Sequence, residues 1–371
     1  MQEINTKNGI VKIFATTIED EAIAQIIRTA ESPLGVNSQI RIMPDGHFGA
    51  GCCIGTTMKV IDKVCPNLVG VDIACSVRLV KTDIDFNGQL EKLDKCIRKC
   101  VPSGFKKHNT PRIETEWFDQ LRCVCFLKKE VIRSATLSLG TLGGGNHFIE
   151  AYDDGYVCVH TGSRNIGLCV AQHYQHLAIT QQKARTNEQL SKANAELSYL
   201  EGEDKDDYIH DIKIIQEFAK MNRTEILAAI CIGMKAKEID VIDCSHNYID
   251  TDTMILRKGA TDAGEGKQLL IPLNMRDGLL ICSGKGNPDW NYSAPHGAGR
   301  LYGRSKAKQM FSVSDYKKTM EGIYSTCINS DTLDEAPFVY KDWEEIAKLI
   351  EPTAEIEKRL IPIYNYKAGK E

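Results

Sequence analysis

The sequence predicts a mixed α+β fold in which several β-sheets are surrounded by helices. Short apolar runs alternate with loops rich in Gly, Pro, Ser and Asn over residues 43–55, 67–80 and 240–301, which is the pattern of strands joined by tight turns. Residues 171–234 are rich in Gln, Lys, Glu, Ala and Leu and almost lack glycine, which indicates a helical insertion. These two observations define the expected fold class.

Further helices are expected on both sides of the insertion. The first opens at Thr17 as the N-cap, with Glu19 and Asp20 in its first turn and apolar residues at helical spacing up to Ala30. Apolar recurrence predicts helices over residues 86–100, 117–135, 306–324 and 342–350. Within the insertion, the acidic run 201–207 is expected to be a solvated turn.

Composition limits the class of protein and its partners. The 371-residue chain is 42% hydrophobic, and its net charge of −4 argues against broad electrostatic coating of nucleic acid while leaving room for a local basic groove. It has no run of about 18 apolar residues and no signal-peptide pattern at its N-terminus, so we expect a cytoplasmic protein with no membrane partner. Most of its 14 cysteines are expected to be buried free thiols.

Four of the nine histidines lie in runs of Gly, Ser and Asn that come after apolar, strand-like stretches. They are His147, His160, His246 and His296. Loops on a rigid scaffold often display functional groups, so this shared setting predicts a single site. Because the candidate residues are scattered from position 45 to position 296, we expect one domain over residues 1–371, with the helical insertion at about 171–234.

Asp72 and Cys75 stand three residues apart after the apolar run 68–71, which we expect to be a strand. Together with His147, His160 and His246 they offer five metal ligands, one more than a closed structural zinc site needs, so two ions bridged by the thiolate fit better. Mixed oxygen, nitrogen and sulfur donors suit zinc, manganese, iron and cobalt alike. The alternative for any one histidine is a hydrogen-bonded core or loop residue, but four in like settings disfavour coincidence.

His296 stands among small residues, and three roles are open to it: a further metal ligand, a general base or a nucleophile. Imidazole attacks phosphorus readily, and a phosphoramidate divides one phosphoryl transfer into two easier steps. The neighbouring glycines would let a nucleotide approach the backbone. Positive charge for phosphates is available from Arg164, Arg300, Arg304, Lys306 and Lys308, with an ordinary solvated helix face as the alternative for the last four.

Seven separate strings resemble, in order, the signature of the RtcB family of RNA ligases. They are Met43-Pro44-Asp45-Gly46-His47, Val71-Asp72-Ile73-Ala74-Cys75, Gly144-Gly145-Asn146-His147-Phe148, His160-Thr161-Gly162-Ser163-Arg164, His246-Asn247-Tyr248, Arg257-Lys258-Gly259-Ala260-Thr261 and His296-Gly297-Ala298-Gly299-Arg300. The likeness continues to Asp334-Glu335-Ala336-Pro337, to Tyr340-Lys341 and to the terminal segment 362–367.

The resemblance implies an RtcB-like fold and an enzyme that uses GTP and two manganese ions. Such an enzyme joins RNA ends bearing a 3′-phosphate or 2′,3′-cyclic phosphate to 5′-hydroxyl ends, in RNA repair or tRNA splicing. Its histidine becomes guanylylated, GMP passes to the RNA 3′-phosphate, and the 5′-hydroxyl then displaces GMP. Broken RNA and GTP are the implied partners, with an archease-like activator as a further candidate.

Individual residues match the family's functional positions. Matching metal ligands are Asp72, Cys75, His147, His160 and His246, and His296 matches the guanylylated histidine. Matching nucleotide-binding positions are Asn146, Glu150, His296, Gly297, Ala298, Gly299, Tyr340 and Lys367, with Tyr340 expected to stack on guanine. Matching RNA phosphate contacts are Arg164, Asn247, Arg300 and Arg304.

The sequence departs from the family pattern at several positions. Ala74 and Ser76 replace glycines beside the cysteine, and Asn165 follows Arg164 where glycine is common. Asn274 and Leu279 fall where the family has groups on the guanine side of the site. The stretch between His246 and His296 is shorter than in long family members, which favours RNA repair over tRNA splicing.

Two other classes of function compete with ligation. A dinuclear phosphatase or cyclic phosphodiesterase acting on RNA ends would keep the metals and use them for hydrolysis. A catalytically silent RNA-binding protein would need the phosphate contacts but not the five metal ligands. Covalent labelling of His296 by GTP separates the ligase from both.

Overall fold

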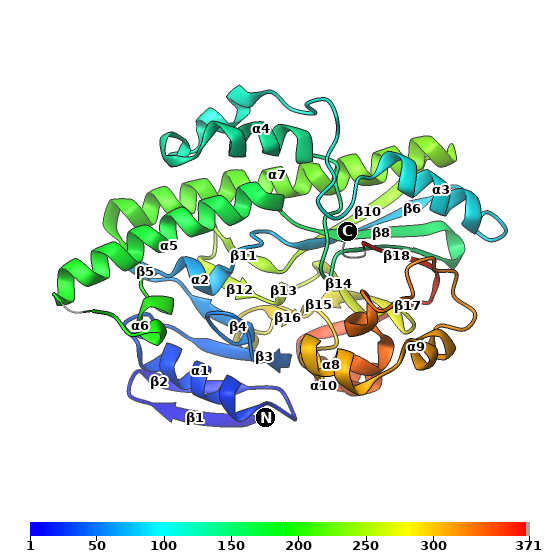
Figure 1. Ribbon diagram of the computed structural model, residues 1–371. Coiled ribbons are helices and arrows are strands. Elements are labelled where there is room, and N and C mark those ends of the chain that lie inside the picture. Colours follow the sequence, from blue (N-terminus) through cyan, green and yellow to red (C-terminus); the bar gives the residue numbers. More distant parts are fainter. Residues whose placement is uncertain (188, 369–371) are drawn as a thin grey trace.

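The structure is a computed structural model that describes residues 1–187 and 189–368. Its β-strands form several sheets with helices packed around them, as the sequence predicts (Figure 1). Among the described strands, only β2 (Gly9–Ile13) and β3 (Ile40–His47) pair in parallel, and the other named pairings are antiparallel.

A five-stranded antiparallel sheet forms the centre of the site. Its strands, in spatial order, are β10 (Glu238–Ser245), β6 (Ser76–Thr82), β8 (Tyr156–Thr161), β7 (Phe148–Tyr152) and β18 (Pro362–Lys367). Because side chains alternate between the faces of a strand, Val157 and Val159 pack against helices on one face while Cys158 and His160 point to the other. The same alternation directs Phe148 and Glu150 to the face that carries the site.

Different elements pack against the two faces of this sheet. Helices α3 (Leu90–Cys100) and α7 (Gly202–Met234) lie on the first face, where Ile97 and Ile226 join the valines in one apolar cluster (Figure 1). A three-stranded sheet covers the second face and shares its apolar cluster. Its strands are β14 (Gln268–Asn274), β15 (Gly278–Gly284) and β17 (Ala354–Leu360).

A six-stranded sheet packs beside this centre. Its order is β1 (Gln2–Thr6), β2, β3, β4 (Ile54–Lys59), β12 (Ile255–Lys258) and β11 (Asn247–Asp250). Two short pairs complete the strands, namely β13 (Ala260–Asp262) with β16 (Ser293–Pro295), and β5 (Lys63–Val64) with β9 (Leu200–Glu201). Strands from both halves of the chain therefore share one sheet, which agrees with the expected gathering of distant segments.

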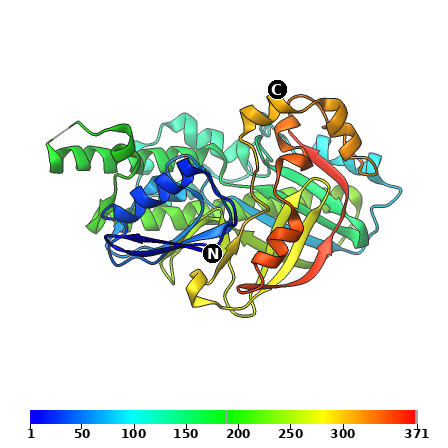
Figure 2. The same ribbon diagram turned by 90° about the horizontal axis from the view of Figure 1, so that it is seen from below.

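The helical insertion is present and begins earlier than expected. It consists of α5 (Arg164–Thr186), α6 (Lys192–Glu196), the short strand β9 and the long helix α7. Its α5–α6 end projects beyond the sheets in both views (Figure 2). The expectation of a solvated turn over residues 201–207 was wrong, because Gly202 begins α7 and its acidic residues occupy the first turns, where they complement the helix dipole.

The remaining helices are short. They are α1 (Asp20–Glu31), α2 (Pro66–Val69), α4 (Lys129–Ser138), α8 (Arg304–Met310), α9 (Val313–Thr319) and α10 (Trp343–Leu349). The 3₁₀ helices are η1 (Thr115–Gln120), η2 (Val124–Phe126), η3 (Asp153–Gly155), η4 (Pro288–Trp290), η5 (Leu333–Glu335) and η6 (Pro337–Val339).

Three helix predictions need correction. Thr17 is not the N-cap of the first helix, because Glu19 occupies that position without a side-chain cap bond. The helix expected over residues 117–135 is divided into η1, η2 and α4, because the buried Asp211 carboxylate accepts hydrogen bonds from the backbone N–H groups of Arg122 and Cys123. The helix expected over residues 306–324 is likewise two helices, α8 and α9.

Most of the cysteines are buried, as their apolar surroundings in the sequence predict. Ten of the 14 cysteines are buried free thiols. In the part of the chain that the structure describes, no helix is long and apolar enough to cross a membrane.

Candidate metal and nucleotide site

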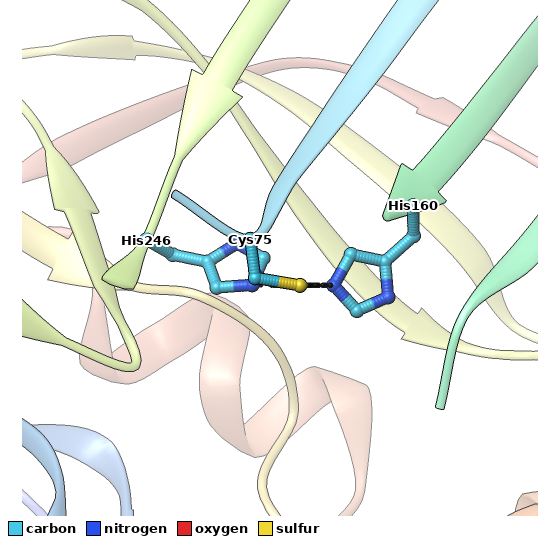
Figure 3. A group of neighbouring side chains, drawn as sticks. All are labelled: Cys75, His160 and His246. Carbon is cyan, nitrogen blue, oxygen red and sulfur yellow. Dashed lines mark hydrogen bonds between the residues drawn. The ribbon is translucent and has the colours of Figure 1, made fainter. Parts of the chain in front are cut away.

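Three candidate ligands converge at neighbouring strands of the central sheet, where Cys75 precedes β6, His160 lies on β8 and His246 follows β10 (Figure 3). The Cys75 Sγ atom lies 3.1 Å from His160 Nε2, and His160 Nε2 lies 3.2 Å from His246 Nε2. All three side chains are buried, and their donor atoms lie within 4.8 Å of one another. Buried sulfur and imidazole donors at this spacing fit a divalent transition-metal ion.

A second donor group shares the same sulfur atom. His147 Nε2 lies 3.5 Å from Cys75 Sγ and 3.0 Å from Asp72 Oδ2. Asp72, Cys75 and His147 again bring their donor atoms within 4.8 Å. The structure therefore brings together all five residues that the sequence singled out, in two groups that meet at Cys75.

The local structure around Asp72 and Cys75 differs from the expected strand end. Pro66 opens the short helix α2, which ends at Gly70, and both ligands lie in the turn between α2 and β6. Ala74 in this turn has φ +55°, a left-handed conformation that glycine adopts more easily. His147 likewise precedes β7, and His160 lies near the end of β8, so only His246 and His296 directly follow strands.

Backbone carbonyls orient two of the imidazole rings. His147 Nδ1 donates to the carbonyl of Leu142 at 2.9 Å, and His160 Nδ1 donates to the carbonyl of Asn146 at 3.1 Å. Because a carbonyl can only accept, each Nδ1 carries a proton, and the Nε2 of the neutral His160 ring faces the sulfur of Cys75 with a free lone pair. Such outer contacts are typical of metal-binding histidines.

Burial and neighbouring charges shift the pKa values of the same donor residues. Desolvation lowers the pKa of His160 to about 3 and that of His246 well below its usual value, so both rings are neutral at pH 7. Burial raises the pKa of Asp72, but the hydrogen bond and charge of His147 outweigh it and hold the pKa below its usual range. Burial and the Asp72 carboxylate raise the pKa of the Cys75 thiol, an effect that a bound cation reverses.

Two adjacent residues of α7, which the sequence reasoning did not single out, hold the segments that carry these ligands. Asn222 accepts hydrogen bonds from the backbone N–H groups of Gly140 and Thr141 and donates to the carbonyls of Thr141 and Gly162. Arg223 donates to the carbonyl of Ala74 at 3.1 Å and pairs with Asp243 on β10 at 2.9 Å. Both side chains are almost fully buried.

His296 lies next to the donor set and pairs with a carboxylate. Its ring centroid is 5.0 Å from that of His246, and its Nδ1 lies 2.6 Å from Oδ2 of Asp45. Asp45 is fully buried on β3, so its carboxylate fixes the ring with Nε2 available for reaction. Gly299 is required close by, because a Cβ there would lie 2.9 Å from the Asp45 carbonyl oxygen and its φ is +78°.

A cavity of about 290 Å³ opens beside His296, and we call it the first cavity. His160 and His246 contribute to its wall. Every residue that the sequence assigned to nucleotide binding lines it, as do three of the four assigned to RNA phosphates. These residues are Asn146, Glu150, Asn247, His296, Gly297, Ala298, Gly299, Arg300, Arg304, Tyr340 and Lys367.

Glu335 organises the far wall of the first cavity, although sequence reasoning assigned it no role. Its buried carboxylate contacts Lys367 Nζ at 2.9 Å, Arg300 Nη1 at 3.1 Å and the Tyr340 hydroxyl at 2.6 Å. Burial raises the pKa of Glu335, but Lys367, Arg300 and Arg304 lower it to about 2. The Glu335 carboxylate is therefore ionised, and it holds the side chains of Lys367, Arg300 and Tyr340 in place.

Glu150 and Asn274 line the first cavity in different ways, and Leu279 does not reach it. Burial raises the pKa of Glu150 to about 7, and this carboxylate accepts hydrogen bonds from Tyr152 and Asn365. The Asn274 side chain closes the turn to Asp277, while Leu279 is buried in the apolar cluster behind the cavity.

Of the four residues matched to RNA phosphates, Arg164 is the one that lies outside the first cavity. It lines a second cavity of about 720 Å³ together with Asp72, His147 and Arg304. Its guanidinium lies beneath the loop that leads to His147 and donates to Thr141 Oγ1 at 3.2 Å. Gly143 has φ +77°, a left-handed conformation that favours glycine, and a Cβ there would also force this guanidinium to shift.

Comparison with known proteins identifies the family. The family model described as "tRNA-splicing ligase RtcB" matches residues 25–368. The chain is 29% identical to RNA-splicing ligase RtcB of Escherichia coli (strain K12), over 92% of this chain and 93% of the relative. It is 26% identical to tRNA-splicing ligase RtcB of Aeropyrum pernix, over 85% of this chain and 84% of the relative.

Fold, site and relatives agree on the class of protein, which is an enzyme of the RNA ligase class. The chain belongs to the RtcB family.

Proposed function

We propose that residues 1–371 act as one catalytic domain that joins RNA 3′-phosphate or 2′,3′-cyclic phosphate ends to 5′-hydroxyl ends, in RNA repair or tRNA splicing. GTP and two manganese ions are the proposed cofactors. The observation that carries the proposal is the contact of 2.6 Å between His296 and Asp45, at the edge of a cavity lined by the expected nucleotide-binding residues. Family membership supports the reaction class.

The chemistry begins at His296. Because Asp45 accepts the proton of Nδ1, the lone pair of Nε2 is free to attack the α-phosphorus of GTP. The new N–P bond replaces the bond to pyrophosphate, which leaves. The imidazole becomes positively charged in this step, and the buried Asp45 carboxylate stabilises that charge.

Two further displacements complete the join. An oxygen of the RNA 3′-phosphate attacks the GMP phosphorus, so the N–P bond breaks and a phosphoanhydride forms. The 5′-hydroxyl oxygen of the second RNA end then attacks the 3′-phosphorus, losing its proton to solvent, and GMP leaves. A cyclic phosphate is first opened by water to the 3′-phosphate.

Other residues bind and orient the reactants. Tyr340 is proposed to stack on the guanine, with Glu150 and Lys367 at its edge and Asn146 on a phosphate. Arg300, Arg304, Asn247 and Arg164 are proposed to hold RNA phosphates, which suits the bidentate geometry of arginine.

The two donor groups fit the proposed metals. Asp72, Cys75 and His147 would hold one ion, and Cys75, His160 and His246 the other. When bound, the ions would supply positive charge for phosphoryl oxygens and help deprotonate nucleophiles.

Labelling by GTP tests the proposal. Incubation with radiolabelled GTP and Mn²⁺ should leave label on the wild-type protein that is lost in acid and kept in base, and none on His296→Ala. ATP in a parallel reaction measures selectivity for guanine. A wild-type protein that stays unlabelled at saturating GTP, yet releases phosphate from RNA ends, would instead be the hydrolase.

A further inference from the structure

The two donor groups face two different cavities. His160 and His246 line the first cavity, whereas Asp72 and His147 line the second. Cys75 joins the two groups, and Arg304 borders both cavities. The donor set therefore lies between two spaces, and the proposed nucleotide contacts fill only the first.

Arg164 and Arg304, the proposed contacts of RNA phosphates, both line the second cavity. We propose that Phe105, at the edge of this cavity, is the platform on which a base of the single-stranded RNA end stacks. The inference rests on the proposed function, because it assigns the RNA side of the same centre. Neither Phe105 nor its neighbours belong to the sequence strings that carry the resemblance to the family.

Phe105 is the most exposed large hydrophobic residue of the described chain, with 89% of its surface accessible. It is nevertheless on a fixed loop, because the N–H of Gly104 donates to the carbonyl of Gly143 at 3.0 Å and Ser103 Oγ contacts the Tyr366 hydroxyl at 2.8 Å. The Gly143 hydrogen bond ties this loop to the one that carries His147. An exposed ring held beside a phosphate-reaction centre is suited to stacking, since every nucleobase has a π face.

The charges around the second cavity favour a polyanion. Lys106, Lys107, Arg164 and Arg304 line it, against the carboxylates of Asp72, Asp331, Asp334 and Glu335. Two of these carboxylates are paired with lysines from outside the lining, Asp334 with Lys308 at 3.0 Å and Glu335 with Lys367 at 2.9 Å. Even without Lys106, five cations (Lys107, Arg164, Arg304, Lys308 and Lys367) face these four carboxylates, so the balance of charge is positive and suits phosphates.

Binding of a short RNA tests this surface in the full-length protein. The probe is a fluorescent ten-nucleotide single strand with a 5′-hydroxyl and a 3′-phosphate, and its affinity is measured by anisotropy at several salt concentrations. Phe105→Ala should weaken binding about tenfold, the loss expected for one stacked base, and Phe105→Tyr should restore it. Phe126→Ala is the matched control, because Phe126 is 70% exposed but lines neither cavity.

A second variant separates charge from stacking. Replacing Lys106 and Lys107 together by alanine should reduce the slope of log affinity against log salt by roughly 0.7 for each phosphate that the variant no longer neutralises. Equal RNA affinities for wild type, Phe105→Ala and Phe126→Ala would overturn the inference. Thermal melting of each variant establishes that it is folded.

Labelling of His296 by GTP is measured in the same preparations, so that failure of the two proposals can be told apart. Labelled wild-type protein whose RNA affinity does not depend on Phe105 would refute the RNA surface and leave the ligase centre standing. Unlabelled protein that binds RNA through Phe105 would refute the proposed ligase chemistry and leave the surface standing.

Discussion

The contact between His296 and Asp45 leads to a prediction about the rate of GTP-dependent labelling. Asp45→Asn keeps the shape of the side chain but removes the charge that fixes the Nδ1 proton and balances the imidazolium. We expect the rate of GTP-dependent labelling to fall by about 10²-fold or more, because the variant removes orientation and charge together. Single-turnover labelling at saturating GTP measures this rate.

Control measurements separate this effect from misfolding. Asp45 is fully buried, so the melting temperature of Asp45→Asn is compared with that of the wild type. Labelling at the wild-type rate in a folded Asp45→Asn variant would show that the carboxylate does not act on His296.

Glu150 makes stability depend on pH. Burial raises its pKa from 4.5 to about 7 in the folded state. The folded state therefore favours the protonated form, and this contribution to stability is complete below pH 4.5 and disappears as the pH rises through about 7. Glu150→Gln should remove up to about 3 kcal/mol of this pH dependence, measured by urea unfolding between about pH 4 and pH 8. If the free energy of unfolding changes with pH by the same amount in Glu150→Gln and in the wild type, the raised pKa of Glu150 is contradicted.

At the scale of elements, α7 acts as the support of the donor set. Asn222→Ala would remove four hydrogen bonds to buried backbone groups, and of these groups the N–H of Thr141 keeps its bond to the carbonyl of Ser138 at 3.2 Å. We expect a loss of about 3 kcal/mol in the free energy of unfolding. Mn²⁺ affinity should fall as well, because the loops before His147 and after His160 would lose the side chain that ties both of them to α7. Calorimetric titration measures the affinity.

Thr224→Ala is the matched control for Asn222→Ala. Thr224 lies on the exposed side of the same helix, and its hydroxyl bonds only to the carbonyl of Lys220 in the preceding turn. It should change neither stability nor Mn²⁺ affinity by a measurable amount. Normal Mn²⁺ affinity in a folded Asn222→Ala protein would limit Asn222 to a structural role.

Elements with a long, strong pattern can be predicted from the sequence, and those decided by tertiary contacts cannot. The insertion is predictable because helical composition persists over residues 171–234. The apolar run 68–71 resembles a strand, but Pro66 at the first helical position starts α2 instead. The segment 117–135 does not form the predicted single helix, because Asp211, remote in sequence, captures its backbone N–H groups.

At the scale of the whole molecule, the site likewise combines residues that local sequence patterns reveal with residues that only tertiary contacts reveal. The five candidate metal ligands and His296 can be named from their local sequence settings and from the resemblance to a family. The roles of Asp45 and Glu335 cannot, because their partners His296, Arg300 and Lys367 are brought to them only by the fold. A carboxylate whose partner lies 251 residues away has no local signal.

The two donor groups predict how the whole molecule binds metal. Calorimetric titration with Mn²⁺ should give two ions for the wild type. His246→Ala leaves Asp72, Cys75 and His147 intact and should bind one, whereas Cys75→Ala removes the donor that both groups share and should weaken both ions. Melting curves provide an independent readout, since Mn²⁺ at about 100 times its dissociation constant stabilises the folded state by about 2.7 kcal/mol per site. One ion in the wild type, or equal stoichiometry in the two variants, would show that the sulfur does not link two metal sites.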